Sequence, residues 1–465
     1  MRSKSHRLLF APCWVLCAAG LVCASLVPSA RAQVVTYYFD VNGSAPGFGI
    51  TTGSTYDWDD TTNGGFWSTS SAGTVATNGW VQGNFPRFAP AAPAPTYTVT
   101  VSNVESVAGM FFSTAQTLTL NPIGSGAFSM VSGLQGVLGS GSANVTINVP
   151  ITGPGGIQPS NGGNISLNAV NTFAGGTNLA STATLVHFNN GSAFGTGAIN
   201  MGIAGFAPLL ASGGATVTLP NSFTSSVTGA GINFAADANT PVVSTGTWTL
   251  GANNLVLRNN GISNSPLTLS GAISGSGAIT LSSNNSDLIT FSGPNTDTGT
   301  VNITGPGGTG TGTTKVTLKL GAANTIASFG SVNLAGGVLD PGGFTHIMNA
   351  TTLKLSASTA PSTIDYGAGP GEIDFANSSA VAWTSGAIVN LANWDPATTF
   401  LRFGTDATGL TAAQLGEIEF NGGGLGTAQL DSNGFVVSPV PEPSSFLLLG
   451  AGAAGLGWWR RRRRA

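Results

Sequence analysis

The residues of this sequence that could perform acid–base chemistry are a few carboxylates. Glu372 and Asp374 are two residues apart in a segment that alternates polar and apolar residues, so on a strand they would share one face. Two carboxylates that flank a glycosidic bond can act as acid and base in its hydrolysis. A lyase would also need clustered cations, yet the basic residues of this region are scattered singly. We therefore expect solvated polar positions here and no catalytic residues.

Metal-binding patterns are equally sparse. His187 and His346 are the only histidines beyond the first 32 residues, and each is expected to be a surface or hydrogen-bonded strand residue. Asp57, Asp59 and Asp60 could offer oxygen ligands to Ca²⁺, but their spacing is not that of an EF-hand loop, which favours an ordinary turn. The sequence predicts no metal site and no cofactor.

The first 32 residues have the pattern of a signal peptide. Three basic residues precede an apolar run over Leu8–Val27, and small residues follow at Ala30 and Ala32, which predicts cleavage before Gln33. The alternative is an uncleaved N-terminal membrane helix. The mature chain would contain no cysteine, because all three lie in the apolar run: Cys13, Cys17 and Cys23.

Composition and charge describe the rest of the chain. Nine of the 15 basic residues lie in the two ends, whereas 17 of the 18 acidic residues lie between them, which leaves the body with a net charge of −11. Nucleic-acid binding requires a basic surface, so this class of partner is excluded. Charged residues make up only 7% and there are 68 glycines, a composition typical of β structure with many tight turns.

Residues 96–398 alternate apolar and polar residues in short runs separated by Gly-rich turns, with ITGPGG occurring at both 151–156 and 303–308. This pattern predicts strands with one buried face, stacked as a parallel β-helix of about 13 coils. A string of β-sandwiches is the alternative. The fold class is therefore all-β.

Two segments are expected to cap this β-helix, because its open ends would expose unpaired strand edges. Residues 33–95 are unusually rich in aromatic residues and end in a proline-rich spacer. Residues 399–437 contain Thr411-Ala412-Ala413-Gln414, a capping box that predicts a short helix with Leu415 and Ile418 on its apolar face.

Residues 438–465 form a distinct tail. Pro441, Glu442 and Pro443 precede an apolar run over Phe446–Trp459, which as a helix would measure about 21 Å against a hydrocarbon core of about 30 Å. A permanent tail anchor is one alternative. Five basic residues would hold the C-terminal end of the tail in the cytoplasm: Arg460, Arg461, Arg462, Arg463 and Arg464.

The tail resembles that of PEP-CTERM proteins, in which Pro441-Glu442-Pro443 would be the sorting motif read by an exosortase, a membrane peptidase. The segments at 170–201 and 335–343 resemble autotransporter-associated β-strand repeats, which in that family build a right-handed β-helix displayed outside the cell. The resemblance implies that the apolar run enters the inner membrane only transiently.

We interpret the chain as an exported, non-enzymatic protein of the cell surface or extracellular matrix, structural or adhesive, which contacts exopolysaccharide or neighbouring cells. One alternative is a glycan-active β-helix enzyme, a polysaccharide lyase or hydrolase. Another is a carbohydrate-binding protein that stacks sugar rings on Trp58, Trp67 and Trp80, although core packing explains these residues more simply.

Overall fold

The computed structural model describes residues 33–438 with short gaps at 62–63, 91–93, 114, 132–134, 140, 161, 237–239, 260–265, 284–287 and 307–313. The predicted signal peptide and the predicted tail helix therefore lie outside the described residues. The chain divides into two compact units, residues 1–34 and 35–465, and the structure described below belongs to the second.

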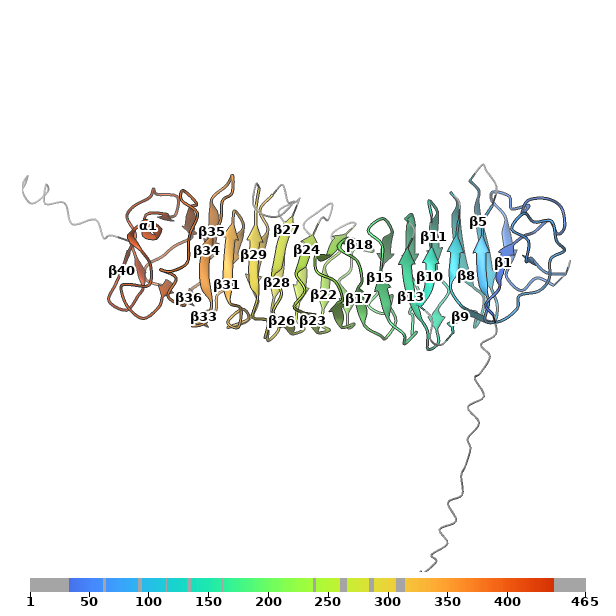
Figure 1. Cartoon of the computed structure of the whole chain (residues 1–465), viewed down its shortest axis with the longest axis horizontal. Coiled ribbons are helices and arrows are strands. Elements are labelled where there is room, and N and C mark those ends of the chain that lie inside the picture. Colours follow the sequence, from blue (N-terminus) through green and yellow to red (C-terminus); the bar gives the residue numbers. More distant parts are fainter. Residues whose placement is uncertain are drawn as a thin grey trace, which may run out of the picture. The chain divides into compact units, whose positions relative to one another are not determined.

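Strands dominate the described residues and form three long sheets (Figure 1). The first sheet has 13 strands, in the order β2 (Thr55–Asp57), β5 (Thr96–Val101), β8 (Thr117–Pro122), β11 (Asn144–Ile147), β14 (Asn164–Leu167), β16 (Leu185–Phe188), β18 (Gly205–Ala211), β21 (Ala230–Ala236), β24 (Leu255–Asn259), β27 (Ile279–Ser283), β29 (Thr300–Thr304), β31 (Ser331–Ala335) and β34 (Thr352–Leu355).

The second sheet has 11 strands, in the order β26 (Ile273–Gly275), β23 (Trp248–Gly251), β20 (Phe223–Ser225), β17 (Ile199–Met201), β15 (Thr177–Leu179), β13 (Gly156–Ser160), β10 (Gln135–Gly139), β7 (Met110–Phe112), β4 (Phe85–Phe88), β1 (Thr36–Phe39) and β3 (Trp67–Ser68). The third has nine: β19 (Val217–Leu219), β22 (Val242–Ser244), β25 (Leu267–Leu269), β28 (Leu288–Phe291), β30 (Thr317–Leu320), β32 (Val338–Asp340), β35 (Ser362–Asp365), β37 (Val389–Ala392) and β39 (Ile418–Phe420).

Three smaller sheets and one helical turn complete the described structure. These are β12 (Ile151–Thr152) with β9 (Ala127–Met130) and β6 (Val104–Val107); β33 (Thr345–Met348) with β36 (Gly371–Phe375) and β38 (Thr399–Phe403); β40 (Gln429–Leu430) with β41 (Val436–Val437); and α1 (Ala412–Leu415).

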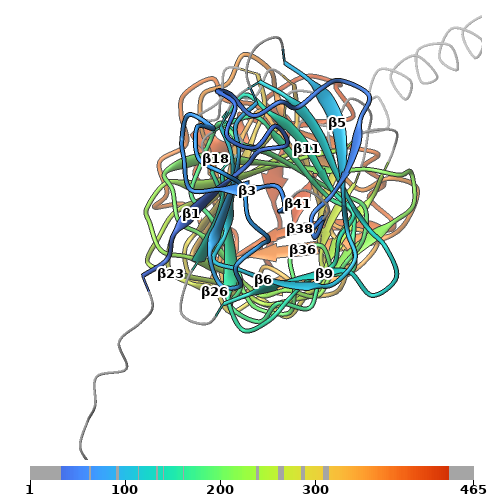
Figure 2. The ribbon, with the colours of Figure 1, turned by 90° about the vertical axis from the view of Figure 1, so that its right-hand side faces the viewer.

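The chain passes from sheet to sheet in rotation, and each turn stacks its strands on those of the turn before. From β19 to β27 it passes from the third sheet to the second and then to the first, three times in succession. Seen along the stacking direction, the sheets surround a common interior (Figure 2). The result is a parallel β-solenoid of about 12 turns, which confirms the predicted parallel stacking and rules out a string of β-sandwiches.

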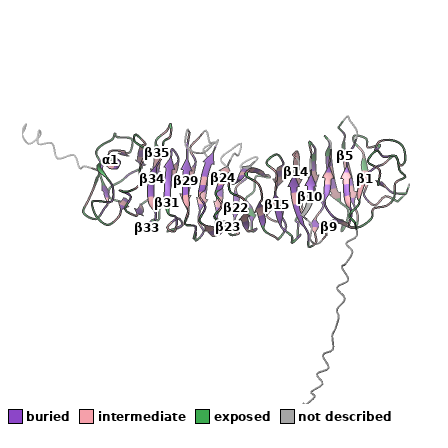
Figure 3. Ribbon diagram, viewed as in Figure 1, coloured by how far each residue is buried: buried purple, intermediate pink, exposed green. Residues whose placement is uncertain are grey.

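The interior is built from apolar columns, one residue from each turn. In the first sheet Val99 pairs in register with Leu120, Leu120 with Ile147, and Ile147 with Leu167, and all four are almost completely buried. Figure 3 shows the same burial repeated from strand to strand. Burying one such side chain stabilises the fold by about 1.5–3 kcal/mol, so the alternation seen in the sequence also fixes the register.

Asparagine and glycine at the corners explain the repeated turn motifs. Asn171 accepts a hydrogen bond from Ile151 N at 2.8 Å and donates to Ala193 O at 2.7 Å, so it joins the turns on both sides. Gly271 lies directly above Gly246, and a Cβ at Gly271 would overlap the carbonyl oxygen of Gly246. Adjacent turns therefore approach too closely at this corner for any side chain.

The aromatic segment 33–95 continues the sheets of the repeat region, because β1 pairs in parallel with β4 and β2 with β5. Trp58 and Trp67 are fully buried, with ring centroids 4.5 Å apart and Trp67 Nε1 donating to Trp58 O at 3.0 Å. Trp80 packs against both rings and is partly exposed. Core packing thus accounts for Trp58 and Trp67, which have no surface to offer a sugar ring.

The capping box at Thr411 is confirmed. Thr411 N donates to Gln414 Oε1 at 2.7 Å, and Gln414 N donates to Thr411 Oγ1 at 3.2 Å. The helix is a single turn, Ala412–Leu415, and the expectation that Ile418 lies on its apolar face is wrong. Ile418 begins β39 instead, because pairing with Val389 of β37 buries it in the solenoid.

We predict that Gly271→Ala destabilises the solenoid by about 1–3 kcal/mol, since the added methyl group forces two turns apart. Gly369→Ala is the matched control, because a Cβ there meets no atom within 4 Å. The stability of both variants is measured by urea unfolding, with resistance to proteolysis as the readout. Equal stability of the two variants would contradict the close approach at Gly246.

Candidate functional site

The outward side of the first sheet carries a row of hydroxyl groups. Thr98 pairs with Thr119, Thr119 with Thr146, and Thr146 with Ser166, so their side chains form one column across β5, β8, β11 and β14. Within the described part of the chain, none of these four hydroxyl groups hydrogen-bonds to another protein atom. His187 continues the column on β16, which confirms its predicted strand position.

Amide side chains flank this row on both sides. On one side Asn148 Nδ2 donates to Asn121 Oδ1 at 2.7 Å, and Asn168 Nδ2 donates to Asn148 Oδ1 at 3.0 Å. On the other side Asn164 Nδ2 donates to Asn144 Oδ1 at 2.7 Å. These bonds tie the amides of successive turns together and hold the surface in a fixed arrangement.

We call this surface, the hydroxyl row with its two amide columns, the hydroxyl–amide face. Neighbouring strands place equivalent groups about 4.8 Å apart, and alternate residues along a strand place the columns about 6.6 Å apart. All the side chains that define it are uncharged. Such a grid can exchange hydrogen bonds with a ligand that is itself rich in hydroxyl groups, in place of water.

The structure brings Glu372 and Asp374 together on the outward face of β36, as their spacing predicts. The expectation that both are solvated is wrong for Asp374, which is 4% exposed and forms an ion pair with Arg402 at 3.1 Å. Burial raises the pKa of Asp374, and the Arg402 charge opposes this shift. Because Arg402 lies opposite Asp374 on β38, strand pairing explains the contact, which links residues far apart in the sequence.

His346 is a hydrogen-bonded strand residue, as expected. It is fully buried in β33, where Nδ1 accepts from Asn324 N at 3.1 Å and Nε2 lies 2.8 Å from Pro341 O. Since Nδ1 is an acceptor, Nε2 carries the proton and donates to the carbonyl group. Burial lowers the pKa of His346, which keeps the ring neutral.

In a later turn, a buried carboxyl group stands where an earlier turn has an aromatic residue beside its corner asparagine. Asn295 bridges two turns as Asn171 does, accepting from Ile273 N at 2.9 Å and donating to Thr325 O at 2.7 Å. Two residues after Asn171 stands the buried Phe173, whereas two residues after Asn295 stands the equally buried Asp297. Desolvation raises the pKa of Asp297, whose Oδ2 has no hydrogen-bond partner among the described residues.

The aspartates near residue 57 form a turn, as predicted, because Asp59 N donates to Asp57 Oδ1 at 3.1 Å. Over the described residues, no group of three or more His, Cys, Asp or Glu side chains is arranged to hold a metal ion. Instead Asp59 interacts with Glu105 of β6, which is 2% exposed and accepts from Gln82 Nε2 at 2.7 Å. The pKa of Glu105 is raised to about 7, mainly by burial; the hydrogen bond from Gln82 opposes this shift, and the nearby Asp59 adds to it.

The chain leaves the described structure at Ser438, immediately before the predicted sorting tail. Residues 439–463 match the PEP-CTERM protein-sorting motif. A PEP-CTERM motif marks an exported, envelope-associated protein that is sorted through its C-terminus, and it is generally associated with processing by an exosortase. The match covers the tail alone.

No curated protein and no solved structure shows a significant match to the chain. The predicted resemblance of the solenoid to autotransporter-associated repeats therefore stays a prediction. In the region that the structure covers, no helix is long and apolar enough to cross a membrane, while the Phe446–Trp459 run lies beyond that region.

We predict that Glu105→Gln flattens the dependence of stability on pH. The folded protein holds this proton up to about pH 7, whereas an unfolded glutamate loses it near 4.5. The stability that the raised pKa confers is full below pH 4.5 and is lost as the pH rises through about 7. Between pH 4.5 and 8 the free energy of unfolding, measured with urea, should fall by up to about 3 kcal/mol more for the wild-type protein than for the variant. If the stability of both proteins changes with pH in the same way, the pKa of Glu105 is not raised and the prediction is wrong.

Proposed function

We propose that this chain is an exported, non-enzymatic protein of the cell surface or extracellular matrix, whose hydroxyl–amide face adheres to polysaccharide. The observation that carries the proposal is the row of hydroxyl groups on β5, β8, β11 and β14 that have no protein partner within the described residues. Hydrogen bonds to the hydroxyl groups of a glycan can replace those to water.

Several features support a neutral glycan as the partner. The face contains no charged group, so it offers nothing specific to a charged polymer. Its repeat of about 4.8 Å is comparable with the length of one sugar ring in an extended chain, so successive turns could contact successive sugars. Asn side chains held by ladder hydrogen bonds lose little further entropy when a ligand binds.

We propose the following route to the surface. The signal peptide, residues 1–32, is removed before Gln33, and the apolar tail then holds the exported chain in the inner membrane with Arg460–Arg464 on the cytoplasmic side. An exosortase next cleaves at Pro441-Glu442-Pro443. The PEP-CTERM match supports the sorting step, and the net charge of −11 on the body agrees with a protein kept away from anionic surfaces.

We propose further that residues 33–95 and 399–437 cap the two ends of the solenoid. In support of this, β3 pairs antiparallel with β1 at the end of the second sheet, and the aromatic cluster fills the first turns. At the other end, Gln414 of α1 donates to the carbonyl oxygens of Ser378 and Val381 at 2.9 Å. Such contacts cover groups that would otherwise invite pairing with another chain.

Replacing three hydroxyl groups of the face tests adhesion. We predict that Thr98→Val, Thr119→Val and Thr146→Val together weaken retention on immobilised exopolysaccharide about tenfold or more, because three hydrogen bonds are lost. The matched control replaces Thr218, Thr268 and Thr290 by Val on the outward side of the third sheet. Equal retention of the two variants, or new reducing ends or unsaturated products, would contradict the proposal.

Alanine substitution of the sorting motif tests the route. We predict that Pro441→Ala, Glu442→Ala and Pro443→Ala together leave the full-length chain in the membrane fraction, since the peptidase can no longer read the motif. Immunoblotting of membrane, envelope and medium fractions measures the result. Normal shortening and release of this variant would rule out processing at these residues.

A further inference from the structure

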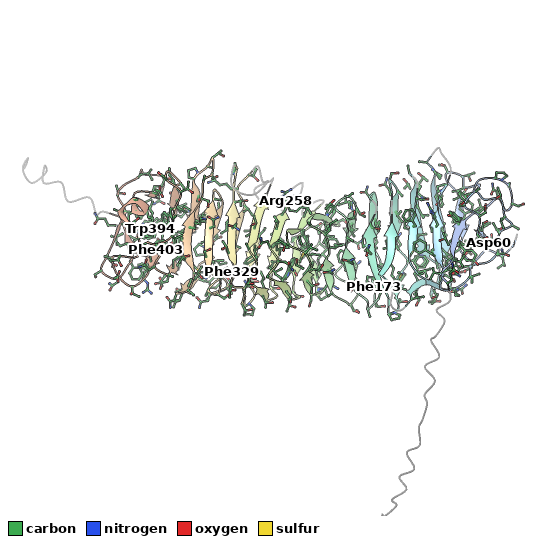
Figure 4. The ribbon with its side chains drawn as sticks, viewed as in Figure 1. Asp60, Phe173, Arg258, Phe329, Trp394 and Phe403 are labelled. Carbon is green, nitrogen blue, oxygen red and sulfur yellow. The ribbon has the colours of Figure 1, made fainter. Side chains whose placement is uncertain are left out.

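An apolar groove lies at the C-terminal end of the described chain. It has a volume of about 340 Å³ and lies beside β38, β41 and the loop between β37 and β38, in the region where Figure 4 labels Trp394. Its apolar lining residues are Trp394, Pro396, Phe400, Phe435, Val436 and Val437. None of the residues that line the groove is basic.

The groove exposes large apolar side chains that the fold could have buried. Leu401 and Phe403 of β38 point inward and are fully buried, which directs Phe400 outward, where it is 39% exposed. Phe435 packs against the Phe400 ring with centroids 6.1 Å apart, and Val437 is 38% exposed. Exposed apolar side chains clustered in this way mark an interaction surface.

The groove also contains a buried donor that lacks an acceptor. Trp394 is 8% exposed, and its ring packs against those of Tyr366 and Phe420 at 5.7 and 5.4 Å. Its Nε1 has no hydrogen-bond partner among the described residues. This nitrogen has almost no accessible surface, so Trp394 offers a bound partner part of its apolar ring and not its N–H group.

The position of the groove restricts what can occupy it. Ser438 lines the groove, and Pro441 follows only three residues later, so Pro441 cannot lie more than about 11 Å from Ser438 and Pro443 not more than about 18 Å. A protein that holds Pro441-Glu442-Pro443 is therefore brought close to this end of the solenoid. The single lining carboxylate, Asp431, already accepts bonds from Asn433 N and Phe435 N at 2.8 Å.

We propose that this groove is a docking surface for the membrane peptidase that processes the PEP-CTERM motif, taking an apolar segment of the enzyme. The proposal rests on the proposed function, because it requires processing at the motif. An anionic bilayer is a poorer occupant, since no basic residue of the groove would meet its headgroups.

The test follows processing of the full chain in cells by pulse–chase labelling. Phe400→Asp with Val437→Asp should slow conversion to the shortened form about tenfold or more while the motif remains intact. The matched control is Val170→Asp with Ile123→Asp, at positions 64% and 51% exposed on distant turns, which should be processed at the wild-type rate. Protease resistance of the solenoid verifies folding of every variant.

A further measurement identifies the occupant. A photoreactive benzoylphenylalanine in place of Phe400 should form an adduct with the peptidase. Adducts formed only with lipid, with the chain's own tail or with a second copy of the chain would overturn the proposal, as would wild-type processing of Phe400→Asp with Val437→Asp.

The failure of this proposal differs from that of the proposed function. If alanine substitution of Pro441, Glu442 and Pro443 blocks processing while the groove variants are processed normally, the motif is read without the groove and only the docking proposal fails. If the alanine variant is processed normally, processing at the motif itself is wrong.

Discussion

The structure depends on the requirement that each turn of the solenoid lie in register on the next. A single turn cannot bury its own apolar face, so its stability comes from the columns that it shares with its neighbours. The column through Val99, Leu120 and Ile147 shows this, since each residue is buried by the residues directly above and below it. The corners must meet the same repeat, which is why glycine and asparagine stand where turns approach each other.

This constraint also explains the chemical character of the surface. Stacking orders the outward residues as strictly as the inward ones, so the Thr and Asn side chains of β5, β8, β11 and β14 form a regular grid without any site having been built for it. A grid of this kind suits a repeating ligand better than a small substrate. Of the two carboxylates on β36, Asp374 is engaged in a buried ion pair with Arg402.

Much of the fold could be predicted from the sequence, because alternation of period two and glycine-rich turns are local signals. In contrast, nothing local in PNTDTGTV indicates that Asp297 is buried where the corresponding position of an earlier turn has Phe173. The partners of Asp374, His346 and Glu105 could not be predicted. Arg402, Asn324 and Gln82 come from other turns, and the number of residues per turn varies too much for the register to be counted along the sequence. The groove at Trp394 depends on the return of residues 435–437 to β38, which likewise has no local signal.

The account is tested most directly by the mass of the chain recovered from the cell envelope and from the medium. It predicts a released protein that begins at Gln33 and ends within or close to Pro441-Glu442-Pro443, with the arginine-rich tail absent. An envelope-bound chain that still ends at Ala465, with no shortened form in either fraction, would contradict it.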